Sequence, residues 1–135
     1  MSVGILIISH EDIGHAILNT TKTIIGSIPC PVETVSIDMD CDCDTQIKNI
    51  KKIANNLNCG DGLLILTDLF GATPSNIASA IDDKNSVLVS GLNLPMLIRV
   101  LNYYTLPLYE LSDKAIGGGQ DGIMAYYPNK INEAS

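Results

Sequence analysis

Two side chains with complementary chemistry follow apolar runs in this chain. His10 comes after the run Val3–Ile8 and Ser9, and Asp68 comes directly after a second run, Gly62–Thr67. A carboxylate that accepts a hydrogen bond from one imidazole nitrogen fixes the tautomer and leaves the lone pair of the other nitrogen free to attack. We therefore expect His10 to be a nucleophile that Asp68 orients.

A candidate phosphate site follows the second apolar run. Thr73 followed by Pro74 is typical of a helix N-cap and a first helical position. Backbone N–H groups at a helix N-terminus suit an anion such as a phosphoryl group, and Gly71 lets the backbone approach that group closely. We expect Gly71, Ala72 and Thr73 to hold phosphate, so that His10 accepts a phosphoryl group and gives it up.

Alternating strands and amphipathic helices must position these residues. The two apolar runs are nearly continuous Val, Ile and Leu, which indicates strands buried on both faces. The connections suit right-handed crossovers between parallel strands. The sequence therefore predicts an α/β fold with a single doubly wound, mainly parallel sheet and helices on both faces. The expected strands are Val3–Ser9, Val32–Ile37, Gly62–Thr67 and Val87–Ser90, and the expected helices are Ile13–Gly26, Thr45–Leu57, Pro74–Ile81 and Leu94–Tyr104.

The C-terminal part of the chain has a looser pattern. One more helix is indicated near Tyr109–Ala115, and Gly117–Gly119 is expected to break it. The segment Gly122–Tyr127 mixes Ile, Met and Tyr and predicts an added strand. A strand attached by a glycine hinge at a chain end is the kind of element that exchanges between subunits of a dimer. We expect one domain over residues 1–128 and a flexible tail over residues 129–135.

Length and charge exclude several classes of protein. A chain of 135 residues can bury a core of its own. The net charge of −7, with eight scattered basic residues, argues against nucleic acid and anionic membranes as partners. No apolar run approaches the roughly 18 residues of a membrane span, and no signal peptide is evident. We predict a cytoplasmic protein whose cysteines are reduced.

The acidic loop Asp38–Asp44 alternates Asp with Cys41 and Cys43 and invites comparison with metal sites. Its spacing matches no calcium loop, and a lone Cys-x-Cys is weak evidence for zinc. We predict no metal and no cofactor. The loop instead supplies negative charge at the start of the following helix, with Asp44 as the expected N-cap.

Three segments lie at the ends of predicted strands: Ile8–His10, Thr67–Asn76 and Ser90–Leu97. Together they resemble the IIA component of the mannose family of the bacterial phosphoenolpyruvate-dependent sugar phosphotransferase system, and the likeness spans nearly the whole chain. The resemblance implies a cytoplasmic phosphocarrier that takes a phosphoryl group from phospho-HPr on His10 and passes it to a IIB component. It further implies that Asp68 orients the imidazole, that Thr73 holds the phosphate, and that a C-terminal strand is exchanged in a homodimer.

One position departs from the family pattern. Members of the family usually carry glycine directly after the active histidine, where this chain has Glu11 followed by Asp12. Negative charge beside a phosphohistidine weakens it by repulsion unless the side chain turns to solvent. The departure also fits a regulatory member that works without a permease.

Two other classes of protein share parts of this pattern. A response-regulator receiver domain has acids after its first strand and a phosphorylated aspartate after its third, which Glu11, Asp12 and Asp68 imitate. A receiver also needs a lysine at a later strand end, and none is evident. A flavodoxin-like binding module should have a Ser-, Thr- and Gly-rich loop after its first strand, and the segment Ser9–Asp12 is too acidic for that.

Overall fold

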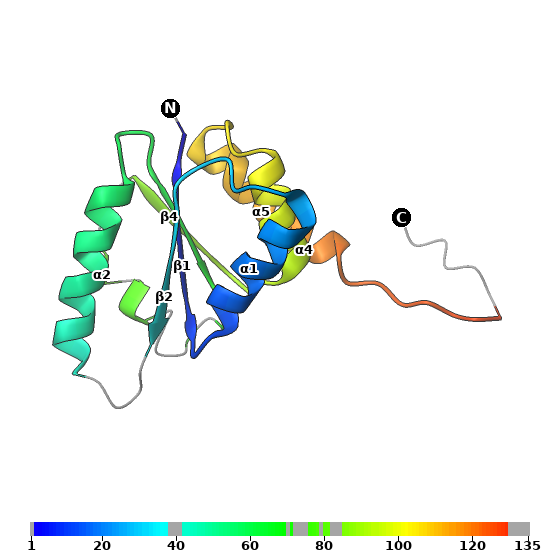
Figure 1. The fold of residues 1–135 in the computed structure, drawn as a ribbon, viewed down its shortest axis with the longest axis horizontal. Helices are drawn as coiled ribbons and strands as arrows, with labels where there is room; N and C mark the ends of the chain where they lie inside the picture. The colour runs from blue at the N-terminus through cyan, green and yellow to red at the C-terminus, as the bar shows by residue number, and fades with distance from the viewer. Residues whose placement is uncertain are drawn as a thin grey trace.

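Four parallel strands form the sheet of the computed structural model, which describes residues 2–37, 42–69, 71, 76–78, 80, 81 and 85–129. The strand order is β2-β1-β3-β4, and every neighbouring pair is parallel. β1 and β3 are central, which explains their nearly uniform burial. The predicted α/β fold with a doubly wound parallel sheet is confirmed (Figure 1). The strands are β1 (Gly4–His10), β2 (Val32–Ile37), β3 (Leu63–Thr67) and β4 (Ser86–Ser90).

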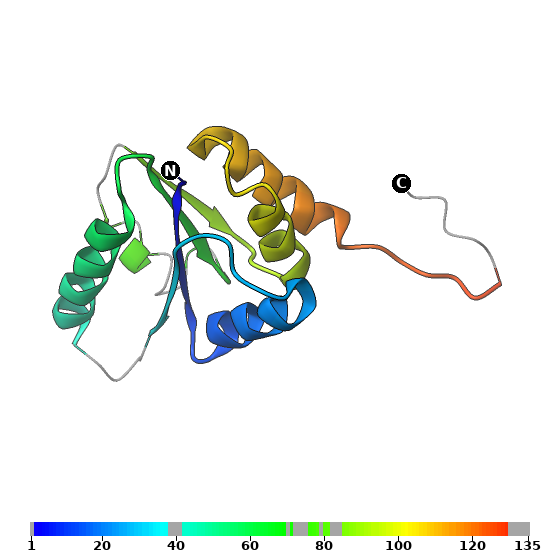
Figure 2. The ribbon, with the colours of Figure 1, turned by 45° about the horizontal axis from the view of Figure 1, so that its top comes forward.

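Helices cover both faces of this sheet (Figures 1 and 2). On one face α1 (Ile13–Ile25), α4 (Leu94–Asn102) and α5 (Leu108–Asp121) pack over one set of alternating strand side chains. On the other face α2 (Cys43–Leu57) and residues 77, 78 and 81 pack over the second set. Because side chains alternate along a strand, each central strand contributes to both apolar clusters.

The N-cap of α2 differs from the prediction by two residues. Asp42, not Asp44, caps the helix, and its carboxylate accepts from the backbone N–H of Asp44 at 3.3 Å and from the Thr45 hydroxyl at 3.0 Å. Because Asp alternates with Cys here, Asp42 and Asp44 are both of a residue type that can cap the helix. Starting the helix at Cys43 puts the Asp44 carboxylate in the first turn, where the helix dipole favours negative charge.

The predicted helix break at Gly117–Gly119 is wrong, because α5 continues through these glycines to Asp121. The glycines allow α5 to lie close against α4. A Cβ atom added at Gly118 would lie 2.5 Å from Arg99 Cβ, and one at Gly122 would lie 2.4 Å from Pro95 Cγ. Close packing of the two helices thus outweighs the low helix propensity of glycine.

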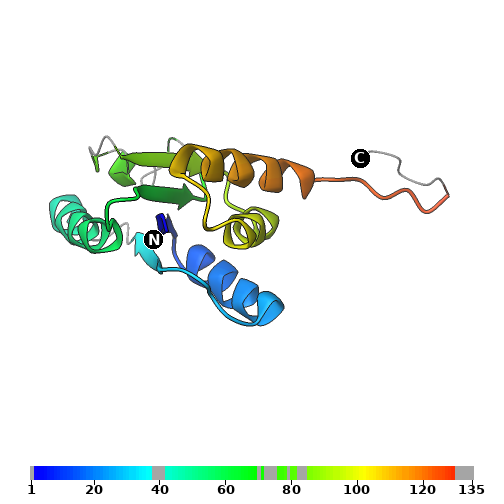
Figure 3. The same ribbon diagram turned by 90° about the horizontal axis from the view of Figure 1, so that it is seen from above.

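The segment Gly122–Tyr127 is not a strand of its own chain's sheet, contrary to the simplest form of the prediction. Gly122 caps α5, and the residues beyond it lead away from the body of the domain (Figure 3). Large apolar side chains along this segment are exposed, with Ile123 77%, Met124 70% and Tyr126 80% accessible. A single chain therefore leaves this apolar segment in contact with solvent.

Candidate active site

The carboxyl edge of the sheet brings His10 and Asp68 together. His10 is the last residue of β1, and Asp68 follows the last residue of β3. The two strands are neighbours, with Ile8 opposite Thr67 in the register. Parallel pairing of β1 with β3 therefore brings together His10 and Asp68, which are 58 residues apart in sequence, as the two apolar runs predicted.

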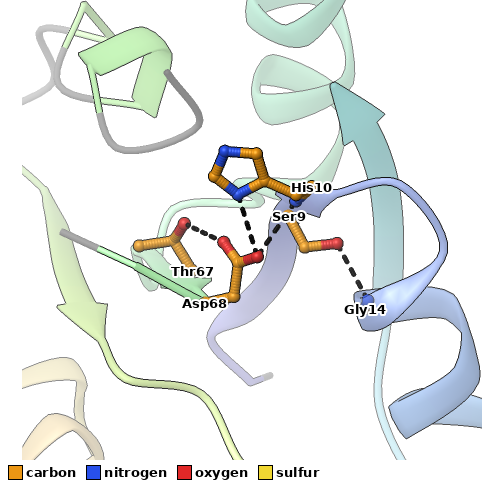
Figure 4. A network of polar contacts seen from close by, with 5 residues as sticks. All are labelled: Ser9, His10, Gly14, Thr67 and Asp68. Atoms are coloured by element: carbon orange, nitrogen blue, oxygen red, sulfur yellow. Dashed lines mark hydrogen bonds and ion pairs between the residues drawn. The ribbon is translucent and has the colours of Figure 1, made fainter. Parts of the chain in front are cut away.

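Both contacts between His10 and Asp68 use the same carboxylate oxygen. Asp68 Oδ2 accepts from the backbone N–H of His10 at 3.1 Å and lies 3.0 Å from His10 Nδ1 (Figure 4). The His10 side chain is 30% exposed and the Asp68 side chain 11%. An ionised carboxylate only accepts hydrogen bonds, so a neutral imidazole here carries its proton on Nδ1. That tautomer leaves a lone pair on Nε2, which faces away from Asp68 in Figure 4.

Two hydroxyl residues beside the pair were not predicted to have roles. Thr67 donates from Oγ1 to Asp68 Oδ1 at 3.4 Å, and Ser9 Oγ accepts from the backbone N–H of Gly14 at 2.8 Å (Figure 4). The Ser9 contact ties the end of β1 to the first turn of α1. It also requires glycine at position 14, where a Cβ atom would lie 2.9 Å from Ser9 Oγ and 2.5 Å from Ile7 Cγ2. A buried Ser or Thr at the end of an apolar strand is the signal that could have revealed both.

Glu11 occupies backbone space that favours glycine. Its φ angle is +46°, and it is the one residue other than glycine with positive φ in the described part of the chain. A side chain in this conformation costs roughly 1 kcal/mol. The turn from β1 to α1 therefore explains why the family pattern has glycine there, and the exposed Glu11 side chain is tolerated at a cost in backbone strain.

Only part of the predicted phosphate site can be placed. Gly71 has φ +85°, and no atom of the described residues lies within 4 Å of where its Cβ would be. Ala72 and Thr73 lie outside the described residues. The described residues contain no group of three or more His, Cys, Asp or Glu side chains arranged to hold a metal ion.

The fold and the site define a class: a doubly wound α/β domain with a carboxylate-oriented, partly exposed imidazole at the carboxyl edge of its sheet. A family model described as the phosphotransferase system fructose IIA component, EIIA-man, matches residues 4–133. The chain belongs to this family, the mannose-type IIA components of the phosphotransferase system, and the resemblance inferred from its three segments is confirmed. By its family, the chain is a component of the phosphotransferase system.

Individual relatives agree with this assignment. The mannose-specific EIIAB component of Escherichia coli strain K12 is 26% identical over 139 residues, an alignment that covers all of this chain but 43% of that protein. The chain thus spans less than half the length of the curated relatives it matches. Among solved structures, the EIIA component from Streptococcus agalactiae is 27% identical with a TM-score of 0.80, covering 92% of this chain and 97% of that one. The mannose/sorbose-specific IIA subunit from Enterococcus faecalis shares the fold with a TM-score of 0.84 at 23% identity, covering 98% and 100%.

None of the helices in the described ranges combines the length and the apolar character that crossing a membrane would require.

Proposed function

We propose that this chain is a cytoplasmic phosphocarrier in which His10 takes a phosphoryl group from phospho-HPr and hands it to a IIB component, in sugar uptake or in regulation linked to it. Family membership supports phosphoryl transfer in general. The single observation that supports His10 as the carrier is the double contact of Asp68 Oδ2 with the backbone and the ring of that residue.

The chemistry uses the Nε2 lone pair of His10. Nε2 attacks the phosphorus of phospho-HPr and forms a new N–P bond, while the N–P bond to the donor's imidazole breaks and its electron pair returns to the donor. Positive charge develops on the His10 ring as the bond forms, and the adjacent Asp68 carboxylate stabilises that charge. In transfer to the IIB component, a nucleophile of that component attacks the phosphorus and forms the new bond, while the His10 N–P bond breaks and its electron pair returns to Nε2.

Phosphate oxygens need donors during both transfers. We propose that Gly71, Ala72 and Thr73 supply them, through backbone N–H groups and the Thr73 hydroxyl. No described residue lies close enough to the Cβ position of Gly71 to keep a phosphoryl group from the backbone there.

A homodimer is the second part of the proposal. The exposed segment Gly122–Tyr127 would pair with an edge strand of the sheet in a second copy, because its apolar side chains would then leave solvent and strand edges can accept a further strand. Light scattering on the full chain and on a chain ending at Asp121 tests this. We expect a dimer for the full chain and a monomer for the shortened one; a full chain that is monomeric at micromolar concentration would contradict it.

The carrier proposal is tested by incubating the protein with phosphoenolpyruvate, enzyme I and HPr, and measuring its intact mass. We expect one phosphoryl group on the wild type, lost in mild acid, and none on His10→Ala. That variant keeps the backbone N–H that Asp68 accepts, so it should fold as the wild type does. A label that survives in His10→Ala, or that resists acid and is lost in base as an acyl phosphate on Asp68 would be, contradicts the proposal.

A further inference from the structure

The Thr67 hydroxyl is a polar group on an otherwise apolar strand. All five residues of β3 are buried, and Thr67 is 0% exposed. Strand alternation puts its side chain on the face of Leu63 and Ile65, which belong to the apolar cluster under α2. Valine has the same branched shape, so packing does not require a hydroxyl here. Burying a hydroxyl is unfavourable unless it is hydrogen-bonded.

The partner of this hydroxyl is the carboxylate that holds His10. Thr67 Oγ1 donates to Asp68 Oδ1, whereas both donors of His10 converge on Oδ2 (Figure 4). The two oxygens of Asp68 thus serve different residues. In the described part of the chain, every buried side-chain nitrogen or oxygen has a hydrogen-bond partner, so the network is satisfied.

The hydrogen bond from Thr67 restrains a rotation of the Asp68 carboxylate that the two contacts with His10 do not fully prevent. Both donors of His10 act on Oδ2, so they oppose rotation of the carboxylate about the Cβ–Cγ bond of Asp68 from one side only. Such a rotation would carry Oδ2 and its lone pairs out of line with His10 Nδ1, and hydrogen bonds to carboxyl oxygens depend on that direction. A donor fixed to β3 and directed at Oδ1 opposes the rotation.

We propose that Thr67 is a positioning residue for phosphoryl transfer, whose buried hydroxyl holds the Asp68 carboxylate so that His10 keeps its proton on Nδ1 and presents the Nε2 lone pair. The inference rests on the proposed role of His10 as the phosphoryl acceptor. Because Thr67 is fully buried, it cannot touch HPr. Its loss should therefore lower kcat and leave the KM for phospho-HPr unchanged.

Three variants separate this role from packing. Thr67→Val keeps the shape and removes the hydroxyl, Thr67→Ser keeps the hydroxyl, and Thr67→Ala removes the hydroxyl in a second way should the valine variant not fold. Thr21→Val is the matched control, because Thr21 is also 0% exposed and its hydroxyl donates to the Ile17 carbonyl at 2.8 Å, within α1.

Two readouts are measured on each variant. Nitrogen NMR of the His10 ring, without any phosphoryl donor, reports the tautomer; transfer from phospho-HPr gives kcat and KM. In Thr67→Val, or in Thr67→Ala, we expect a mixture of tautomers and a kcat lower by roughly threefold to tenfold, a modest loss because the Thr67–Asp68 contact of 3.4 Å is longer than an ordinary O–H···O hydrogen bond. Thr67→Ser should restore both, and Thr21→Val should change neither.

The possible results discriminate between the two proposals. An unchanged His10 tautomer and kcat in the hydroxyl-free variant would overturn the role of Thr67 while leaving His10 as the carrier. A rise in KM without a fall in kcat would also overturn it, since that pattern reports docking. Failure of the wild type to accept phosphate would overturn the carrier proposal itself.

Discussion

Replacing Asp68 with Asn tests how the site fixes its histidine, because the structure dictates which way the amide must face. One of the two donors at Oδ2 is the backbone N–H of His10, which can never accept a hydrogen bond. An amide NH₂ in that position would oppose two N–H groups. The amide carbonyl should therefore replace Oδ2, and the NH₂ should face Thr67, whose hydroxyl can rotate to accept.

This orientation sets the size of the effect on transfer. The Asn carbonyl keeps the Nδ1–H tautomer, so only the negative charge is lost. A charge-assisted hydrogen bond is roughly twice as strong as a neutral one, and a neutral one contributes about 1 kcal/mol. With His10 30% exposed, solvent screens much of the remaining attraction. We expect a loss of about 1–2 kcal/mol of transition-state stabilisation, which is roughly 5- to 30-fold in rate.

Rapid-quench measurement of phosphoryl transfer from labelled phospho-HPr gives this rate for Asp68→Asn. Asp121→Asn is the control, because it removes an exposed carboxylate that pairs with Arg99 at 3.3 Å on a different pair of elements, α4 and α5. A wrong histidine tautomer costs about ten-thousandfold in a serine protease triad. A loss of that size would refute the predicted amide orientation, and an unchanged rate would remove the Asp68 charge from the mechanism.

Three further predictions concern stability and reactivity. Glu11→Gly should raise the free energy of unfolding by about 1 kcal/mol by relieving the positive φ, whereas Glu11→Ala keeps the Cβ and should not; equal denaturation midpoints for the two would contradict the strain. Gly118→Ala should destabilise by about 1–3 kcal/mol because its Cβ would collide with α4. Gly117→Ala has room for its Cβ and should be neutral or stabilising by up to about 1 kcal/mol in the same denaturation experiments. If Gly117→Ala were the more destabilising of the two substitutions, the close packing of α5 against α4 would be refuted. Burial raises the pKa of the Cys30 thiol from 9.0 to about 11, so its thiolate is scarce below that pH. Near neutral pH we expect Cys30 to be alkylated roughly a hundredfold more slowly than an ordinary thiol and after the exposed Cys43 and Cys59; comparable alkylation rates by mass spectrometry would contradict this.

The sheet and the principal pair were predictable because they depend on local patterns and one topological rule. Continuous apolar runs identify the central strands, and parallel strands end at one edge, so His10 and Asp68 had to be close if β1 and β3 were neighbours. The glycines of α5 were misjudged for a non-local reason. Whether Gly118 breaks a helix or allows a close contact depends on Arg99 of another helix, which no pattern within the segment reveals.

The supporting contacts of the site were missed for a different reason, because both are local in sequence. Thr67 and Ser9 each look like an ordinary strand-end residue, and only the side-chain conformation shows that Thr67 donates to the adjacent Asp68 and that Ser9 accepts from Gly14. The departure at position 11 was visible in the sequence only as a difference in residue type. Only the backbone conformation shows that this residue adopts a φ of +46°, where a side chain causes strain.

The way Asp68 is anchored suits a residue that must serve two chemical states. In the proposed carrier cycle, the backbone N–H of His10 would still donate to Oδ2 after the ring is phosphorylated, and a phosphoryl group on Nε2 would leave the proton on Nδ1 in place as the second donor. Neither hydrogen bond needs to be broken when phosphate arrives or leaves. A carrier must accept and release the same group at comparable free energy, and a site that keeps its contacts in both states adds no reorganisation cost to either step.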